Sequence, residues 1–338
     1  MKEITGLPGK RTPKFMTALI LAAAFGFFPA AAAAQDRSFE KLLETFRAGE
    51  SYERHSAAME LGKSGNGAAV EPLIQGLRDP DYLLRSFSAL ALGDLKDARA
   101  LEPLLGALGD EHQRVRRSAI EALGLLGNPA ALDPLVKCLE DPDFLVRRSA
   151  ASALGMLGRP EAVAPLLKML GEEDIYLWNG AANALTGIGG AAVPQLVAAL
   201  PDWIRGPRVA EILKTLGWEA SSAEEKVRYD VAARDKGAMA ANWDSVRKVL
   251  IADAESGDAA RAESAVYALI GIGGDETVDT LAGILRTRGT AAMAQAFLNS
   301  GNTRLSETAR AWAAQGKIQL EPAGQPPAVA WGALGVQP

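Results

Sequence analysis

Very few side chains in this sequence of 338 residues could act as metal ligands or as nucleophiles with a base beside them. The sequence contains two histidines, His55 and His112, and a single cysteine, Cys138. Three such residues at these spacings cannot form a zinc cluster, and neither histidine lies in a recognisable triad context for a nucleophile. Catalysis by carboxylates alone stays open, but nothing distinguishes a pair among the 41 aspartates and glutamates. We therefore expect no metal, no cofactor and no catalytic residue of these classes.

These side chains are all positioned by a repeat of 31 residues. The run Arg-Ser-Phe-Ser-Ala-Leu-Ala-Leu-Gly that begins at Arg85 returns in related form at Arg116 and Arg147. Glycines and prolines recur in the same register, at Gly62, Gly93, Gly124 and Gly155 and at Pro72, Pro103, Pro134 and Pro165. Such periodicity identifies stacked supersecondary units, each too small to bury its own apolar face.

Two helices make up one unit of the repeat. Apolar residues recur every three or four positions over residues 115–126, which predicts an amphipathic helix. Gly127 is a natural helix stop, and after a short loop the apolar residues of 132–139 predict a second helix. The Asp-Pro-Asp turn at 141–143 ends the unit and supplies Asp143 as the N-cap of the next helix. The sequence therefore predicts an all-α fold of stacked helical hairpins.

The repeat resembles the HEAT family, and within it the phycobilisome-lyase-like branch. The resemblance is carried by the Val/Leu-Arg-x-x-Ala-x-x-Ala-Leu-Gly helix, the Pro-Leu helix that follows it and the Asp-Pro-Asp turn. It covers residues 51–200 clearly and residues 201–316 in degraded form. The resemblance implies an α-solenoid, a superhelix of HEAT-like repeats.

HEAT repeats usually carry an aspartate in the turn and an arginine six residues later. The sequence keeps this spacing in three pairs: Asp79 and Arg85, Asp110 and Arg116, and Asp141 and Arg147. The arginines could be ligands for an acidic partner. We favour a structural ladder. An arginine that reaches a turn carboxylate and loop carbonyls supplies hydrogen bonds to groups that stacking would otherwise leave without a partner. The series breaks at the next pair, Glu172 and Trp178.

The first 34 residues have the order of a secretory signal peptide. Four basic residues, Lys2, Lys10, Arg11 and Lys14, precede an uncharged run over residues 15–34, which ends in an Ala-x-Ala sequence. This order predicts cleavage after Ala34 and a periplasmic or secreted protein. The alternative is an uncleaved membrane anchor formed by residues 15–34, because that run just reaches the length needed to span a bilayer.

The net charge argues against a nucleic-acid partner. Cleavage after Ala34 removes four basic residues and Glu3, so the formal net charge falls from −5 to −8. Nucleic-acid binding depends on a basic face that neutralises phosphates. We therefore expect a protein or peptide partner, and contact with a membrane only if the N-terminal segment stays uncleaved.

The regularity of the repeat divides the rest of the chain. Residues 35–200 are expected to form regular N-terminal repeats, and residues 201–316 irregular or degenerate repeats that end in a C-terminal cap. Residues 317–338 are rich in proline, glycine and alanine, which predicts a disordered tail. The bulky residues between Trp178 and Trp218 mark a seam between sub-arrays or a specialised site. We favour the seam, because bulky residues fill gaps where the stacking geometry changes.

In HEAT stacks the arginine-bearing helices usually line the concave face. Residues outside the apolar stripe of these helices fall into columns one repeat apart. The columns combine aromatic rings with arginines, which are typical interface anchors. They indicate six protein-binding residues: Tyr82, Arg117, Phe144, Arg148, Tyr176 and Asn179. The alternative is a solvated inner face on which Tyr82 and Phe144 pack under the turns.

These features give one main functional hypothesis and two alternatives. The main hypothesis is an exported, non-enzymatic HEAT-like scaffold that binds another protein or peptide through its solenoid surface. The family resemblance also suggests a bilin-lyase-like or other enzyme-accessory activity. An uncleaved N-terminal segment would instead give a membrane-anchored periplasmic assembly factor. Iron-binding HEAT enzymes use repeated His-Glu pairs, whereas His55 precedes Ser56 and His112 precedes Gln113, so that iron site cannot be assembled.

Overall fold

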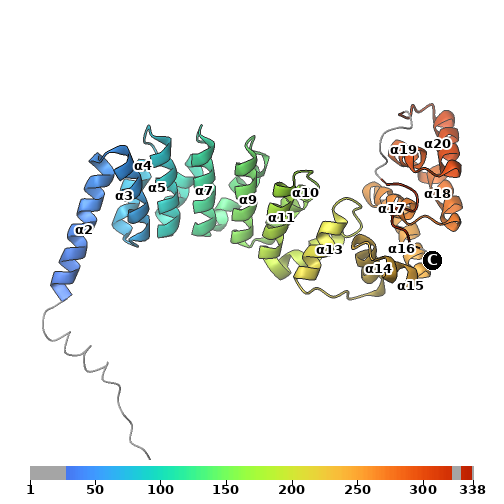
Figure 1. Ribbon diagram of the computed structural model, residues 1–338, viewed down its shortest axis with the longest axis horizontal. Coiled ribbons are helices and arrows are strands. Elements are labelled where there is room, and N and C mark those ends of the chain that lie inside the picture. Colours follow the sequence, from blue (N-terminus) through green and yellow to red (C-terminus); the bar gives the residue numbers. More distant parts are fainter. Residues whose placement is uncertain (1–27, 322–328, 337–338) are drawn as a thin grey trace, which may run out of the picture. The chain divides into compact units, whose positions relative to one another are not determined.

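A computed structural model describes residues 28–321 and 329–336 of the chain (Figure 1). Within these ranges every regular element is a helix, which confirms the predicted all-α fold. The chain forms two compact units, Met1–Ala122 and Leu123–Pro338. The division falls inside one helix, α7 (Gln113–Leu126). The change of regularity expected at residue 200 lies within the second unit.

In the first unit, helices that are neighbours in sequence pack against one another. Helix α3 contacts both α2 and α5, and α4 contacts α5. The elements are α2 (Phe28–Ala48), α3 (Ser51–Lys63), η1 (Gly67–Ala69), α4 (Val70–Gly76), α5 (Tyr82–Leu95), η2 (Ala98–Ala100), α6 (Leu101–Ala107) and the first part of α7.

The second unit continues the helical pairs and adds the irregular C-terminal helices. Helix α9 contacts α11, and further along the chain α16 contacts α17 and α19 contacts α20. After the last residues of α7, the elements are η3 (Pro129–Ala131), α8 (Leu132–Lys137), η4 (Cys138–Glu140), α9 (Phe144–Leu157), η5 (Pro160–Ala162), α10 (Val163–Met169), α11 (Ile175–Ile188), η6 (Gly189–Ala192), α12 (Val193–Ala199), α13 (Gly206–Thr215), α14 (Ala223–Ala232), α15 (Lys236–Ala241), α16 (Trp243–Ala254), α17 (Ala259–Ile272), α18 (Asp275–Arg288), α19 (Ala291–Asn299) and α20 (Thr303–Gly316).

Aspartates in the turns start the first helix of successive repeats. Asp81 Oδ1 accepts the backbone N–H of Leu83 at 2.8 Å. Asp143 Oδ1 accepts that of Val146 at 3.0 Å, and Asp174 caps α11 in the same way. A carboxylate at this position satisfies an otherwise unpaired amide and faces the positive end of the helix dipole. The turn chemistry predicted from the sequence therefore fixes where these helices begin.

The glycine column marks places where two helix backbones touch. A Cβ atom on Gly93 would lie 2.6 Å from the Cα atom of Ala122, and one on Gly155 would lie 2.7 Å from that of Ala184. Both distances are too short for any side chain, so only glycine permits this approach of the backbones. The recurring glycines and alanines of the sequence are therefore packing partners from successive repeats.

Most of the predicted signal peptide lies outside the described residues, which begin at Phe28. Helix α2 runs through Ala34, the predicted cleavage position. Among the described helices, none combines the length and the apolar character that a bilayer-spanning helix requires. The expectations of cleavage and export therefore still rest on the sequence.

Residues 329–336 differ from the disordered tail expected for residues 317–338. The backbone N–H groups of Gly332 and Leu334 donate to the carbonyls of Ile270 and Gly271, at 2.9 and 2.7 Å. Three side chains of the segment are buried in the core of the second unit: Val329, Leu334 and Val336. The last carbonyls of α17 have no partner within their own helix, and this segment supplies one. The proline-, glycine- and alanine-rich composition masked these three apolar anchors.

Candidate protein-interaction surface

Helices α9 and α11 are neighbours in the second unit (Figure 1). Each exposes a narrow stripe of residues. Exposure recurs every fourth residue, which is the spacing of one face of a helix. The stripe on α9 consists of Phe144, Arg148, Ser152 and Met156, and that on α11 of Ile175, Asn179, Asn183 and Gly187. Tyr176 is exposed beside the second stripe. These nine residues are called the α9–α11 face below.

The two stripes lie next to each other because α9 and α11 pack closely. A Cβ atom on Gly180 of α11 would lie 3.3 Å from Cγ of Arg148 on α9. Near the other end of the helices, the contact of Gly155 with Ala184 brings the two backbones together. Each residue of one stripe also has its repeat equivalent, 31 positions away, in the other. The α9–α11 face is therefore one continuous surface.

One end of the α9–α11 face is apolar. Phe144, Ile175 and Tyr176 are 44%, 54% and 61% exposed. All three stand in the first turn of their helices, where the preceding aspartate fixes the backbone. Large apolar side chains that already pack partly against the protein lose little conformational entropy when a partner covers them. This end has the properties of an interface anchor.

The middle of the α9–α11 face is polar and unpaired. Arg148 is exposed and forms no ion pair or hydrogen bond through its side chain with any described residue. Asn179, Asn183 and Ser152 are exposed in the same way. Their donors and acceptors are therefore available to a partner. Two exposed acidic residues, Glu172 and Glu173, precede α11 at the apolar end.

The structure brings together four of the six residues predicted from the sequence: Phe144, Arg148, Tyr176 and Asn179. Tyr82 and Arg117 belong to the first unit. The ring of Tyr82 stacks on that of His112, with centroids 3.8 Å apart. Arg117 was expected to be exposed like Arg148. It is half-buried instead, and its Nε atom is buried without a hydrogen-bond partner among the described residues. Sequence reasoning missed Ser152, Ile175 and Asn183, although they stand in the same repeat columns.

The arginine ladder has a different geometry from the α9–α11 face. Arg85 Nη1 donates to the carbonyls of Asp79 and Pro80 in its own turn, at 3.0 and 3.2 Å. Its Nε and Nη2 atoms donate to both carboxylate oxygens of Asp110 in the next turn, at 2.8 and 2.9 Å. Arg85 therefore connects two successive turns. Arg54 pairs with Asp79 one repeat earlier, at a position that the 31-residue register identifies.

Burial and pairing shape the electrostatics of this ladder. Burial by itself raises the pKa of the Asp110 carboxyl, but hydrogen bonds from Arg85 and from the backbone N–H of His112 outweigh it. The pKa of Asp110 is therefore lowered from its usual value of 3.8. The same pairing raises the pKa of Arg85 above its usual value. Both side chains are nearly buried, and these contacts are those of a structural ion pair.

The ladder changes partner at Trp178, where the sequence breaks the series. Arg208 on α13 lies over the Trp178 ring, with its guanidinium carbon 4.6 Å from the ring centroid. Its Nη1 atom donates to the carbonyls of Leu170 and Glu172. An arginine from a later helix therefore satisfies the Glu172 carbonyl, which stands six residues before Trp178 as the Asp79 carbonyl stands before Arg85. Sequence reasoning missed Arg208, because its partners lie more than a repeat earlier in the chain.

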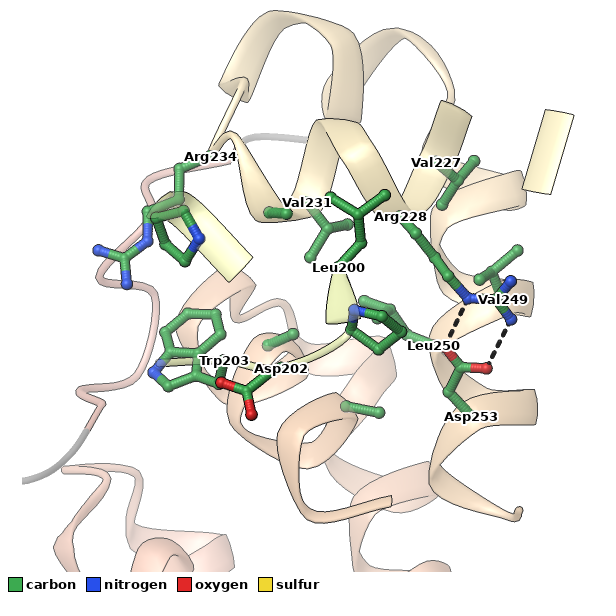
Figure 2. Close-up of a pocket in the computed structure, with 15 residues that line it drawn as sticks. Leu200, Asp202, Trp203, Val227, Arg228, Val231, Arg234, Val249, Leu250 and Asp253 are labelled. Atoms are coloured by element: carbon green, nitrogen blue, oxygen red, sulfur yellow. Dashed lines mark hydrogen bonds and ion pairs between the residues drawn. The ribbon is translucent and has the colours of Figure 1, made fainter. Parts of the chain in front are cut away.

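The irregular segment after α12 encloses a small apolar pocket (Figure 2). Its cavity of about 20 Å³ has room for about one water molecule, far below the size of a site for a small-molecule ligand. Trp203 fills one side and is covered by Arg234, whose guanidinium carbon lies 5.0 Å from the ring centroid. The Trp203 ring would also lie 3.0 Å from a Cβ atom on Gly271. This geometry supports the seam over the specialised site.

The buried carboxylate of this pocket is fully engaged. Arg228 Nε and Nη2 donate to the two oxygens of Asp253 at 3.1 and 2.8 Å, as Figure 2 shows. Arg261 Nε donates to Asp253 Oδ1 at 2.9 Å. Only 4% of Asp253 is exposed, and two arginines compensate the cost of burying its charge. The contacts of Arg228 and Arg261 with Asp253 therefore connect α14 and α17 to α16.

Both histidines have structural partners in the first unit. His55 Nε2 lies 2.6 Å from Asp81 Oδ2. His112 Nδ1 accepts the backbone N–H of Arg114 at 3.2 Å, which caps the start of α7. No group of three histidine, cysteine or acidic side chains that could hold a metal occurs in residues 28–321 and 329–336.

Comparison with known families identifies the repeat. Residues 39–120 and 101–186 match the family described as HEAT repeats. Residues 39–186 are HEAT repeats. The sequence resemblance to this family is thereby confirmed. The arginine-bearing helices α3, α5, α7 and α9 lie within the matched region, and so does α11 up to residue 186.

Several solved structures are similar to the chain at low identity. The complex of CpcE and CpcF of phycocyanin lyase from Nostoc sp. PCC7120 is 22% identical, with a TM-score of 0.36; the match covers 72% of this chain and 94% of that chain. Human deoxyhypusine hydroxylase in complex with glycerol is 20% identical, with a TM-score of 0.37 and coverages of 86% and 99%. An engineered protein is 19% identical, with a TM-score of 0.38 and coverages of 85% and 99%. Similarity at this level transfers no activity or partner. No curated protein matches the chain in sequence.

The HEAT repeats contain almost all of the α9–α11 face and none of the pocket. Only Gly187 of the face lies beyond residue 186, whereas the pocket begins at Leu200. The open surface is thus part of the regular array, and the closed pocket belongs to the irregular helices that follow it.

Proposed function

We propose that this protein is an exported, non-catalytic HEAT scaffold that binds another protein or peptide through the α9–α11 face. The observation that carries the proposal is the combination of exposed apolar anchors, Phe144, Ile175 and Tyr176, with the unpaired Arg148 beside them. Aromatic and arginine side chains are the residues most enriched at binding hot spots. Packed helices hold these anchors in place, so little order has to be created on binding.

Export is the part of the proposal that rests on residues 1–34. A basic segment, an uncharged run and an Ala-x-Ala sequence occur there in the order of a secretory signal. The intact mass of the protein purified from its native compartment tests this part. We expect a chain that begins near Gln35 in the soluble extract. A chain that retains Met1 in the membrane fraction would favour the anchor instead.

Binding is tested by affinity capture from extracts of that compartment. The double variant Phe144→Ser, Tyr176→Ser removes two anchors from the α9–α11 face, and we expect at least about tenfold less captured partner. The matched control is Tyr52→Ser, which removes a tyrosine that is 82% exposed on α3 of the first unit. Circular dichroism melting establishes that each variant is folded.

The proposal fails if the double variant melts normally and still captures the same proteins at unchanged affinity. Loss of capture with Tyr52→Ser alone would move the binding surface to the first unit.

A further inference from the structure

Two primary amides on α11 form a regular pair. Asn179 and Asn183 are exposed, stand one helical turn apart and make no side-chain hydrogen bond with any described residue. A primary amide carries both a donor and an acceptor. Each of these two side chains can therefore bind an N–H and a C=O group of a partner at the same time.

The spacing of the amides matches an extended peptide. Four residues of an α-helix span about 6 Å along its axis, and two residues of an extended chain span about 6.6 Å. Asn179 and Asn183 can therefore bind the backbone of alternate residues in a peptide that lies along α11. A helical partner could not use them in this way, because its backbone groups are already bonded within the helix.

The neighbouring stripe adds a charged group at the same level. Arg148 stands one repeat before Asn179, and Ser152 one repeat before Asn183. Arg147 is bonded to the carbonyls of its own turn, whereas the Arg148 guanidinium is unpaired. A free guanidinium binds a carboxylate through two parallel hydrogen bonds. The peptide would thus carry an acidic side chain opposite Arg148.

The ends of the face decide where that acidic side chain can lie. Glu172 and Glu173 are exposed before the first turn of α11, so a carboxylate at that end would be repelled. Phe144 and Ile175 offer apolar contact there instead. The acidic residue of the peptide is therefore confined to the middle of the face, with an apolar residue toward the first turn.

We propose that the α9–α11 face binds an extended peptide whose backbone is held by Asn179 and Asn183. Arg148 binds one acidic side chain of this peptide, and Phe144 and Ile175 contact one apolar side chain. This inference rests on the proposed function, because it names the kind of partner that the same surface takes.

The probe is a library of short random peptides displayed on phage and selected on the purified full chain. We expect enriched sequences that combine an aspartate or glutamate with an apolar residue a fixed distance away. A synthetic copy of the best sequence then gives the affinity by fluorescence anisotropy. The double variant Asn179→Ala, Asn183→Ala should bind the synthetic peptide at least about tenfold more weakly. Asn242→Ala, which removes an exposed amide outside the face, should leave the affinity unchanged.

Methylation of single backbone nitrogens of the peptide reports directly on backbone binding. We expect large losses at two positions that are two residues apart, and smaller losses elsewhere. Selection on the Arg148→Glu variant should replace the acidic residue of the enriched sequences by lysine or arginine.

The outcomes separate this inference from the proposed function. If Phe144→Ser weakens the peptide while the asparagine variants and backbone methylation do not, the α9–α11 face binds partners but not through an extended backbone. If Phe144→Ser has no effect either, both proposals fail. A selection that enriches no sequence over an unselected library overturns the extended-peptide inference.

Discussion

Side chains from the same repeat column are paired in the first unit and exposed without a partner in the second. In the first unit, His55 is paired with Asp81, and Ser86 is bonded to the Ser118 hydroxyl at 2.8 Å. In the second unit, the equivalents of Ser86 in the same column are Arg148 and Asn179, and both are exposed without a partner.

This difference shows how one scaffold provides both stability and an open surface. The column position is fixed by the helix, so it faces the same way in each repeat. A short side chain such as Ser86 can be buried and bonded to its neighbour from the next repeat. The longer side chains of Arg148 and Asn179 extend to the surface in that position, whereas Arg117 is half-buried there. The exposure of a column therefore depends on which residue occupies it and on what packs beside it, and not on a change of fold.

The largest difference in stability should appear between substitutions of two arginines, Arg85 and Arg148. Arg85→Ala leaves the nearly buried carboxylate of Asp110 without its cation and two turn carbonyls without a donor. We expect a loss of about 3 kcal/mol in the free energy of unfolding. Arg148→Ala should change it by less than about 0.5 kcal/mol. Urea unfolding followed by circular dichroism measures both, and equal losses would show that Arg148 belongs to the structure.

The loss in the free energy of unfolding caused by Arg85→Ala should depend on pH. The folded-state pKa of Asp110 is lowered from 3.8, because hydrogen bonds from Arg85 and His112 outweigh burial. A carboxyl with a lowered folded pKa contributes stability above its unfolded pKa and loses it as the pH falls through the folded value. The difference between the two proteins should therefore be constant above about pH 5 and shrink below pH 3.8. Unfolding at a series of pH values tests this, and a difference that stays constant in acid would assign the deficit to packing.

A smaller contrast is expected between two serines. Ser86→Ala leaves the buried hydroxyl of Ser118 without its partner, and we expect a loss of about 1–2 kcal/mol. Ser152→Ala on the α9–α11 face should change stability by less than about 0.5 kcal/mol. The double change at Ser86 and Ser118 should cost less than the sum of the two single changes, because it leaves no unpaired group. An additive double change would mean that the hydroxyls do not interact.

The sequence predicted the ladder arginines and their contacts within one turn, but not their contacts with the next turn. The spacing of six residues between Asp79 and Arg85 indicated contact within one turn, and Arg85 does bind the carbonyls of that turn. Its carboxylate partner is Asp110, 25 residues further along the chain. Arg208 was not predicted, because a spacing pattern cannot show that a later helix reaches back to an earlier turn.

What the sequence determined by itself is local: the 31-residue period, the aspartates that start the helices, and the glycine and alanine columns. Each follows from the chemistry of a few neighbouring residues, and the repetition makes the pattern visible. The tertiary structure decided which members of a column are covered. Arg117 and Arg148 share one column, yet the first is half-buried and the second exposed. Val329, Leu334 and Val336 are buried in the core of the second unit, although the composition around them resembles that of a disordered tail. Burial depends on the segments that pack from elsewhere in the chain, and no local pattern contains that information.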